Sequence, residues 1–293
     1  MRMGKRRMRL GCLSGCLVAF AVIALSAGAQ TTAPNEWTWM GGSSRTAGPP
    51  GGQPGVYGTL GVFAPGNIPN GRWASVSWID DKGNFWLFGG VGSTVDDDGL
   101  KYNDLWEFNP STNEWAWMAG SNTGSQSGVY GTLGIPSAEN VPGGREDASG
   151  WTDNEGNLWL FGGYGADANG ANGILNDLWE FNPSTNEWAL MGGNIQSVCG
   201  VYCSSNPGAV YGALGTPAPG DHPGAQVAPA GWTDNNGNFW IFGGDPTPAD
   251  EGGFIYYNTL WEYHSVNRRL AYNHPANLQC ACRGLFRNPD RYD

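Results

Sequence analysis

The chain has 293 residues, among them 48 glycines and 15 tryptophans, and a formal net charge of −11. Glycine is more than twice as frequent as the usual ~7% but follows no three-residue period, which excludes a collagen-like chain. Aromatic residues make up 13% of the sequence. That is enough apolar surface to bury a core, so wholesale disorder is excluded as well. The composition is typical of short strands joined by turns.

Residues 1–29 have the pattern of a secretory signal peptide. Five basic residues precede an apolar run at 17–25, and Ala27-Gly28-Ala29 provides a cleavage site. The run is shorter than the ~20 residues that a membrane-spanning helix needs. Leu13-Ser14-Gly15-Cys16 resembles a lipoprotein box, although the apolar run follows it rather than preceding it. We expect a secreted or periplasmic mature chain that starts at residue 30, with no membrane insertion after cleavage.

Loss of this leader leaves 10 basic against 26 acidic residues, a net charge of −16. Nucleic acids and anionic membrane surfaces are both bound through clustered lysines and arginines. We therefore expect no nucleic-acid partner and no binding to an anionic membrane surface.

One unit recurs three times along the chain. Asparagine, four apolar residues and two glycines occupy 84–90, 157–163 and 238–244, at spacings of 73 and 81 residues. A second block stands at 104–115 and 177–188, and in degraded form at 259–263. A third, Val-Tyr-Gly-x-Leu-Gly, stands at 56–61, 129–134 and 210–215. The repetition predicts one supersecondary unit built three times.

Each unit contains four candidate strands, which in the first copy fall at 74–79, 84–88, 105–108 and 114–118. The uninterrupted apolar run before the glycines fits a strand covered on both faces. Gly83 supplies the positive φ of a tight hairpin between the first two strands, where its lack of a side chain is needed. Residues 109–113, Asn-Pro-Ser-Thr-Asn, form the turn between the last two.

Two features resemble the kelch repeat: a double glycine after an apolar strand, and an aromatic residue followed after six residues by tryptophan. The residues that carry them are Gly89, Gly90, Phe108, Trp115, Gly162, Gly163, Phe181, Trp188, Gly243, Gly244 and Tyr263. The resemblance covers 36–267. It implies an all-β, kelch-type β-propeller of the galactose oxidase/kelch superfamily with about three four-stranded blades. The expected blades span about 36–113, 114–186 and 187–267 within a 30–267 propeller region.

The ends of this pattern are irregular. Residues 35–40 read as a lone fourth strand, whereas the third unit ends after its third strand at Tyr263, and the expected tryptophan is Leu270. This predicts that the N-terminal strand completes the C-terminal blade. Because closed propellers have ~4–8 blades, three leave the ring incomplete. We expect self-association through the uncovered blade faces.

Residues 268–293 contain no tryptophan and carry more arginine than acid, unlike the repeats. Two interpretations stay open: a frameshifted or disordered tail, with the chain a non-functional truncated paralogue, or a natural basic tail.

Long connections join each fourth strand to the next first strand, and each second strand to the third. They span 41–71, 120–145 and 192–224, and 91–103, 164–176 and 245–258. In a four-stranded antiparallel blade both kinds lie on one face, and long loops on a rigid scaffold commonly carry recognition. We expect a binding or scaffold module for a protein or polysaccharide on this long-loop face, and no enzyme activity. The alternative is a sugar-directed oxidase or hydrolase.

A galactose-oxidase-like copper site would require two histidines and two tyrosines, one of them cross-linked to cysteine. The histidines are His222, His264 and His274, two of them near the irregular end. A sialidase-like site would need an arginine triad, but Arg45 and Arg72 are too scattered from Arg145 to commit to one. We therefore assign no catalytic residue and no cofactor.

Two kinds of short acidic segment resemble sites in known proteins. Asp81-Lys82-Gly83 resembles the Asp-box turn of sialidases, but it fits an ordinary hairpin turn better. The oxygen-rich loops at 96–99 and 167–172 suggest calcium, yet counting twelve residues from Asp167 gives Leu178 instead of the glutamate of an EF-type loop. We predict a solvated acidic loop there and assign no metal site.

Four cysteines remain in the mature chain: Cys199, Cys203, Cys280 and Cys282. They permit three connectivities in an oxidising compartment, of which we favour Cys199–Cys203; zinc binding is the alternative. The repeated Tyr57, Tyr130 and Tyr211 suggest that tyrosine and leucine anchor each long loop, with stacking on sugar rings as the alternative.

Overall fold

The computed structural model describes residues 35–45, 52–92, 99–197, 208–246, 256–264 and 269–273. The chain divides into two units, Met1–Gly41 and Gly42–Asp293. The predicted signal peptide, the four mature cysteines and the tail beyond residue 273 lie outside the described residues. Within these ranges the secondary structure is all β and includes no helix that could cross a membrane.

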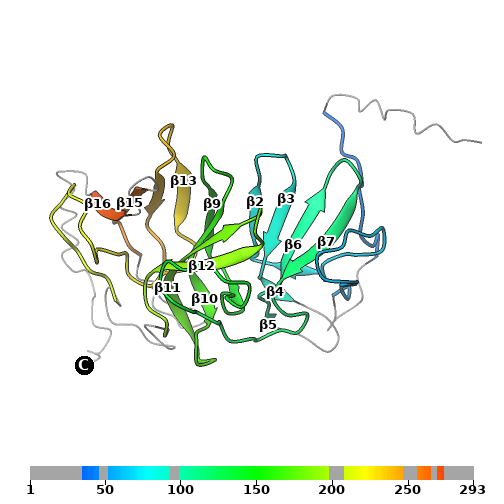
Figure 1. The fold of residues 1–293 in the computed structure, drawn as a ribbon, viewed down its shortest axis with the longest axis horizontal. Helices are drawn as coiled ribbons and strands as arrows, with labels where there is room; N and C mark the ends of the chain where they lie inside the picture. The colour runs from blue at the N-terminus through cyan, green and yellow to red at the C-terminus, as the bar shows by residue number, and fades with distance from the viewer. Residues whose placement is uncertain are drawn as a thin grey trace, which may run out of the picture. The chain divides into compact units, whose positions relative to one another are not determined.

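Three large antiparallel sheets follow one another along the second unit (Figure 1). Sheet 1 contains β2 (Val76–Ile79), β3 (Phe85–Phe88), β6 (Leu105–Asn109) and β7 (Glu114–Ala119) in that order. Sheet 2 contains β9 (Ser149–Thr152), β10 (Leu158–Ala166), β11 (Asn172–Asn182) and β12 (Glu187–Gly192), with β8 (Arg145–Glu146) also beside β10. Sheet 3 contains β13 (Ala230–Thr233), β14 (Phe239–Phe242), β15 (Leu260–His264) and β16 (Arg269–Asn273). A small sheet of β1 (Arg72–Trp73), β4 (Val91–Gly92) and β5 (Leu100–Lys101) completes the set.

The four strands predicted for the first copy correspond to β2, β3, β6 and β7. The hairpin before β3 forms because one carboxylate organises it. Asp80 Oδ1 accepts hydrogen bonds from the backbone N–H of Lys82 and Asn84, and Oδ2 accepts one from Trp86 Nε1 at 3.0 Å. Gly83 has the positive φ that the turn requires, +82°. Asp153 and Asp234 make the same contacts in the later copies.

The second strand ends directly before the double glycine in the first and third copies, at Phe88 and Phe242, but continues through it in the second copy. β10 runs through Gly162 and Gly163 with a shift of register, and it pairs with β9 before them and with β8 after them. Their φ values are +66° and +92°. A Cβ on Gly162 would lie 2.8 Å from the Gln226 carbonyl oxygen, and one on Gly163 would lie 2.5 Å from that of Glu146. The glycines are needed because neighbouring backbone passes this close.

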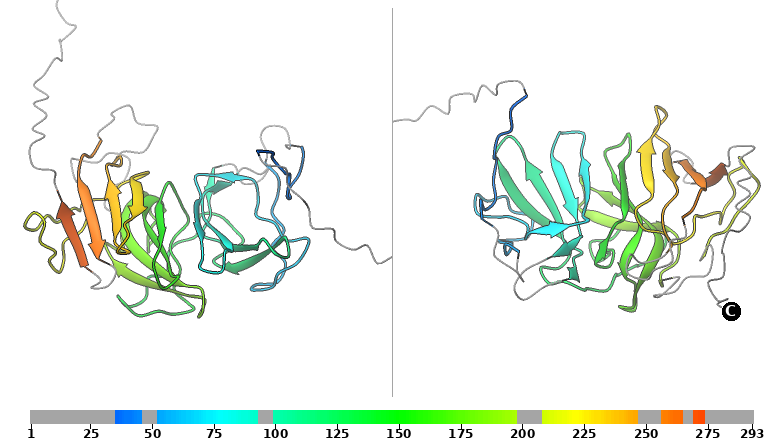
Figure 2. Two further views of the ribbon diagram at one scale, coloured as in Figure 1. Left: turned by 90° about the horizontal axis from the view of Figure 1, so that it is seen from above. Right: turned by 180° about the vertical axis from the view of Figure 1, so that it is seen from behind.

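Side chains alternate between the two faces of each sheet. The forward faces carry Val76, Trp78, Trp86 and Phe88 in sheet 1, Ser149, Trp151, Trp159 and Phe161 in sheet 2, and Ala230, Trp232, Trp240 and Phe242 in sheet 3. The rear faces carry Ser77, Ile79, Phe85 and Leu87, then Gly150, Thr152, Leu158 and Leu160, then Gly231, Thr233, Phe239 and Ile241. Among the first strands of the three sheets, β9 lies beside β2 and beside β13 (Figure 2).

The forward face of sheet 1 packs on the rear face of sheet 2 to form the first core. Ring centroids of Trp86 and Phe181, and of Phe88 and Trp188, are 5.4 Å apart. The forward face of sheet 2 packs on the rear face of sheet 3 to form the second core, where Tyr263 lies 5.1 Å from the Trp159 ring. The aromatic residues singled out in the second and third copies thus bury the junctions between sheets.

Sheet 3 differs from the prediction at its last strand. β16 pairs with β15 and places Leu270 opposite Tyr263, the register in which Trp115 stands opposite Phe108. The expectation that the third unit ends after its third strand, and that residues 35–40 complete it, is therefore wrong. Residues 35–40 form no strand. Backbone pairing requires the spacing of the repeat but not the tryptophan.

Candidate functional site

The most buried charges form an ion pair inside each of the first two copies. Arg145 Nη1 and Nη2 donate to Asp177 Oδ1 and Oδ2 at 2.6 and 2.8 Å. Tyr130 Oη and Trp179 Nε1 donate to the same Oδ2 at 2.7 and 2.8 Å. Burial, then the charge of Asp177, raises the pKa of Tyr130, so its hydroxyl keeps the proton that it donates. These four donors occupy the carboxylate, and the arginine is not available to a ligand.

Arg72 and Asp104 repeat this pair at 2.6 Å in the first copy, and Tyr57 donates to Asp104 at 2.6 Å. The third copy has Gln226 and Thr259 at the two positions. Both charges are therefore lost together, and neither is left buried alone. The Nε2 atom of Gln226 is buried and has no hydrogen-bond partner in the described part of the chain.

In the loop that suggested calcium, backbone N–H groups already occupy both oxygens of the Asp167 carboxylate. Asp167 Oδ1 accepts from the N–H groups of Asn169 and Ala171 at 2.8 and 3.0 Å, and Oδ2 accepts from Ser197 N–H at 2.9 Å. Burial alone would raise the pKa of Asp167, but these hydrogen bonds outweigh it and lower the pKa. The Asp167 side chain is buried, so the prediction of a solvated acidic loop is wrong at this residue. Residues 96–98 lie outside the described residues.

The other predicted candidates stay apart. His222 Nδ1 lies 3.2 Å from Asn176 Nδ2, and His264 Nε2 lies 3.3 Å from Glu262 Oε2. Arg45 is exposed, and His274 lies outside the described residues. Across the ranges that the structure describes, no three His, Cys, Asp or Glu side chains gather in a way that could hold a metal ion.

The long loop before sheet 1 and the long loop before sheet 2 each fold back along an edge of the sheet that follows it. Gly61 N–H donates to Trp117 O at 2.7 Å, beside β7, and Gly134 N–H donates to Leu190 O at 2.7 Å, beside β12. Both loops therefore cover the open edge of a fourth strand, which would otherwise expose unpaired backbone groups. This is a structural role that the sequence interpretation of these loops did not include.

The tyrosine and the leucine that recur in these loops have different roles. Tyr57 and Tyr130 bond to buried aspartates, and the Tyr211 ring lies 5.2 Å from that of Trp261, which supports anchoring. The leucines do not anchor the loops, contrary to the sequence interpretation, because they are 52% to 62% exposed. The exposed aliphatic residues at matching loop positions are Val56, Leu60 and Val62, Val129, Leu133 and Ile135, and Val210 and Leu214. We call this set the aliphatic array.

A second candidate functional site lies between sheets 1 and 2, at positions where charged residues replace residues that are uncharged in the other copies. Lys101 Nζ is 3.2 Å from Glu146 Oε1 and 4.6 Å from the centre of the Tyr164 ring. The matching positions at the next junction are Ile174, Val227 and Asp245. We call Lys101, Glu146, Tyr164 and the adjacent Asp147 the junction cluster. Sequence motifs did not predict it, although aligning the three copies would have revealed charges that occur only once.

Asp147 is the least constrained acid of this cluster. Its backbone links all three units, since its N–H donates to Ala74 O at 3.1 Å and its carbonyl accepts from Ala228 N–H at 2.8 Å. All three residues have positive φ, between +47° and +53°, so this conformation belongs to the repeat. The Asp147 carboxylate is half-buried and makes no hydrogen bond within the described residues. Burial raises its pKa.

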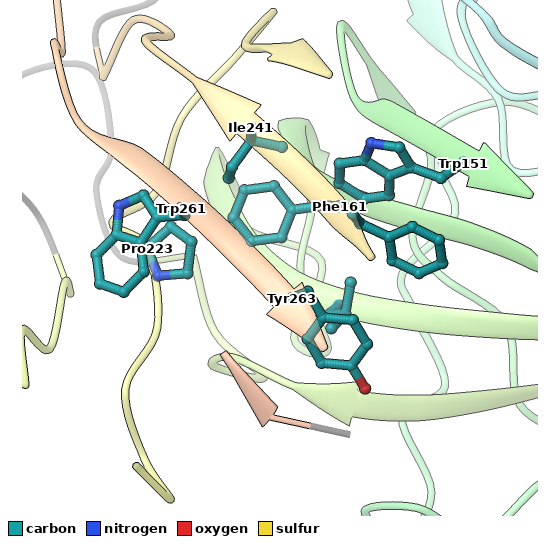
Figure 3. A pocket seen from close by; sticks show the side chains of 8 residues that line it. Trp151, Phe161, Pro223, Ile241, Trp261 and Tyr263 are labelled. Carbon is teal, nitrogen blue, oxygen red and sulfur yellow. The ribbon is translucent and has the colours of Figure 1, made fainter. Parts of the chain in front are cut away.

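A small cavity lies in the second core, lined by apolar and aromatic side chains from sheets 2 and 3 and by Pro223 (Figure 3). Its volume of ≈ 20 Å³ would hold about one water molecule. A void of this size and polarity is a packing gap and offers no ligand pocket.

No protein-family model matches this chain, and no curated protein matches it. Among solved structures it is similar to one titled "Structure of YjhT", with 17% sequence identity and a TM-score of 0.46. The alignment covers 73% of this chain and 55% of that one, so the chain spans about half the length of the similar structure. The chain itself is an all-β protein of repeated antiparallel sheets.

Proposed function

We propose that this chain is an extracytoplasmic binding or scaffold module made of kelch-type propeller blades, one for each large sheet. The repeat, the glycine bends and the forward-to-rear packing of successive sheets support the propeller assignment. The leader-like residues 1–29 support export to the periplasm or the cell exterior. The module would recognise its ligand through residues of the long loops.

The observation that carries a binding role is the aliphatic array. Its members are 47% to 62% exposed at matching positions of three loops, so a large part of each apolar side chain faces solvent. Exposed apolar groups that recur in this way are typical of a protein-binding surface. Sugar rings are usually bound by stacking on aromatic faces, whereas these side chains are aliphatic. We therefore favour a protein partner over a polysaccharide.

The test compares the wild-type chain with the triple variant Leu60→Ser, Leu133→Ser, Leu214→Ser. Both are immobilised and exposed to extracellular proteins and, separately, to a glycan array. A protein retained by the wild type and lost by the variant supports the proposal. Retention of the same glycans by both, with no protein bound, would contradict it.

An enzyme is the second candidate, and the junction cluster favours it. Asp147 is a half-buried carboxylate with a raised pKa, which suits a general acid or base, and an ammonium group belongs to the same cluster on Lys101. Release of product from any glycan by the wild type, abolished in Asp147→Asn, would establish this function in place of the binding module.

A further inference from the structure

Sheets 1 and 3 each have one large face that no other sheet covers in the described part of the chain. On the rear face of sheet 1, Phe85 is 45% exposed and Ile79 is 61% exposed. On the forward face of sheet 3, Trp232 is 46% and Phe242 is 43% exposed. Clustered apolar surface of this kind is uncommon on a soluble monomer and typically marks an interface.

Three of these four positions, all except that of Ile79, are buried wherever a neighbouring sheet is present. Leu158 and Phe239 correspond to Phe85 and are 0% and 1% exposed. Trp78 and Trp151 correspond to Trp232 and are 5% and 6% exposed. Phe85, Trp232 and Phe242 are therefore side chains that the repeat normally buries, and within the described residues no neighbouring sheet covers them.

The two open faces are the two halves of one kind of interface. Each core inside the chain joins the forward face of one sheet to the rear face of the next. A small residue admits the forward-face indole: a Cβ on Gly150 would lie 2.6 Å from Trp78 Nε1, and one on Gly231 would lie 3.0 Å from Trp151 Nε1. Sheet 1 has Ser77 at this rear-face position, whose Cβ and hydroxyl require the facing indole to shift from the position that Trp78 takes over Gly150.

We propose that the forward face of sheet 3 in one copy of this chain packs on the rear face of sheet 1 in a second copy, and the reverse. Trp232 would then face Ser77 of the other copy, with its indole displaced from the position that Trp78 takes over Gly150 because Ser77 carries a side chain. Each contact joins two different surfaces, the forward face of one chain and the rear face of the other. A two-fold axis produces two such contacts and closes the ring, so both open faces of both chains are used. The described residues of each chain form three large sheets, so two chains bring six of them into one ring, within the ~4–8 blades of closed propellers.

A second copy is the occupant because the chain carries both halves of the interface and no described residue of the same chain covers either of them with a sheet. The assembly concerns sheet faces and is independent of the aliphatic array, which lies on the loops. Failure of the assembly would therefore leave the binding proposal standing, and loss of partner binding would leave the assembly standing.

The test is the molar mass of the full chain, measured by light scattering and by sedimentation. The wild type is expected at the mass of two chains. Phe85→Glu and Phe242→Glu are each expected at the mass of one chain, because each places a charge in both symmetry-related contacts. The matched control Leu133→Glu, 62% exposed on a loop, should stay a dimer. Far-UV circular dichroism checks that each variant is folded. Leu87→Glu, at a rear-face position that is buried as Leu160 and Ile241 in the other sheets, forms a second pair with Trp232→Glu.

Mixing the two face variants separates head-to-tail packing from other arrangements. Phe85→Glu keeps an intact forward face on sheet 3, and Phe242→Glu keeps an intact rear face on sheet 1. An equimolar mixture should therefore form a dimer that neither variant forms alone. A monomeric wild type, disruption by only one of the two variants, or a mixture that stays monomeric would overturn the proposal. Open-ended polymers of the wild type would overturn the closed ring.

Discussion

Arg145 and Asp177 form a two-pronged ion pair whose side chains are both fully buried, with its closest nitrogen–oxygen distance at 2.6 Å. Tyr130 and Trp179 complete the hydrogen bonding of the carboxylate. The pair joins the start of β8 to the third strand of the same copy, so it fixes where the chain enters the second repeat, as Arg72 and Asp104 do in the first. Because the third copy lacks both charges, the protein contains its own comparison for what this pair contributes.

Removing one partner of this pair should be costly. Asp177→Ala leaves a buried arginine without its counter-charge, which typically costs about 3–5 kcal/mol of unfolding free energy. The double variant Arg145→Gln, Asp177→Thr, which copies the third repeat, should recover a substantial part of that loss. Urea unfolding measures both. A single variant within about 1 kcal/mol of the wild type, or a double variant no better than the single, would contradict this role of the pair.

The loop before sheet 3 carries an aspartate where the other loops carry asparagine. Asn140 Nδ2 donates to the carbonyls of Ile135 and Trp188 at 3.1 and 2.9 Å, and Asn67 does the same in the first copy. Asp221 holds the matching position, and its buried Oδ2 has no partner among the described residues.

Asp221→Asn should therefore stabilise the protein by about 1 kcal/mol, because an amide can donate where a carboxylate cannot. The reverse change, Asn140→Asp, should destabilise it by about 1–3 kcal/mol, since it unpairs two carbonyls and buries a charge. Thermal melting at neutral pH measures both variants. Equal melting temperatures for Asp221→Asn and the wild type would contradict the first expectation.

The stability contribution of Asp147 should depend on pH in the opposite direction to that of Asp167. Burial raises the pKa of Asp147, so the folded state holds its proton more tightly, and a penalty develops as pH rises from the pKa of the unfolded chain to that raised value. Asp147→Asn should thus raise the melting temperature at pH 7 and leave it unchanged at pH 3.

Hydrogen bonds lower the pKa of Asp167 against the effect of its burial. Its contribution to stability is present above the pKa of the unfolded chain and is lost as pH falls through the lower folded value. Asp167→Asn should therefore reduce the melting temperature at pH 7 and have a smaller effect at the acid end. The same sign for both variants at pH 7 would contradict these assignments.

The strands and hairpins followed from the sequence because they depend on local signals. Apolar runs, Gly83 and the Asn-Pro turn stand next to the strands they define, and β2, β3, β6 and β7 lie where they were expected. The β16 strand was missed because its tryptophan is replaced by Leu270, while the register that sets the pairing is not a side-chain signal.

The site could be predicted less well because its contacts join distant residues. Asp104 begins a repeated block and Arg72 was considered only for an arginine triad, and it is the fold that brings the two together within the copy. The loop leucines were expected to anchor and are exposed instead, since the loops bond to a strand edge through backbone groups. The junction cluster has no motif of its own.

The same four-stranded sheet occurs three times in the described residues, and in each copy the second strand lies between two hydrogen-bonded neighbours. Hydrogen exchange of the full chain tests this most directly, because β3, β10 and β14 are hydrogen-bonded on both sides and such strands exchange most slowly. We expect three peptides of comparable slow exchange, around 85–88, 158–161 and 239–242. Exchange in any one of them as fast as in the exposed loop residues would contradict the three-fold repeat of the sheet.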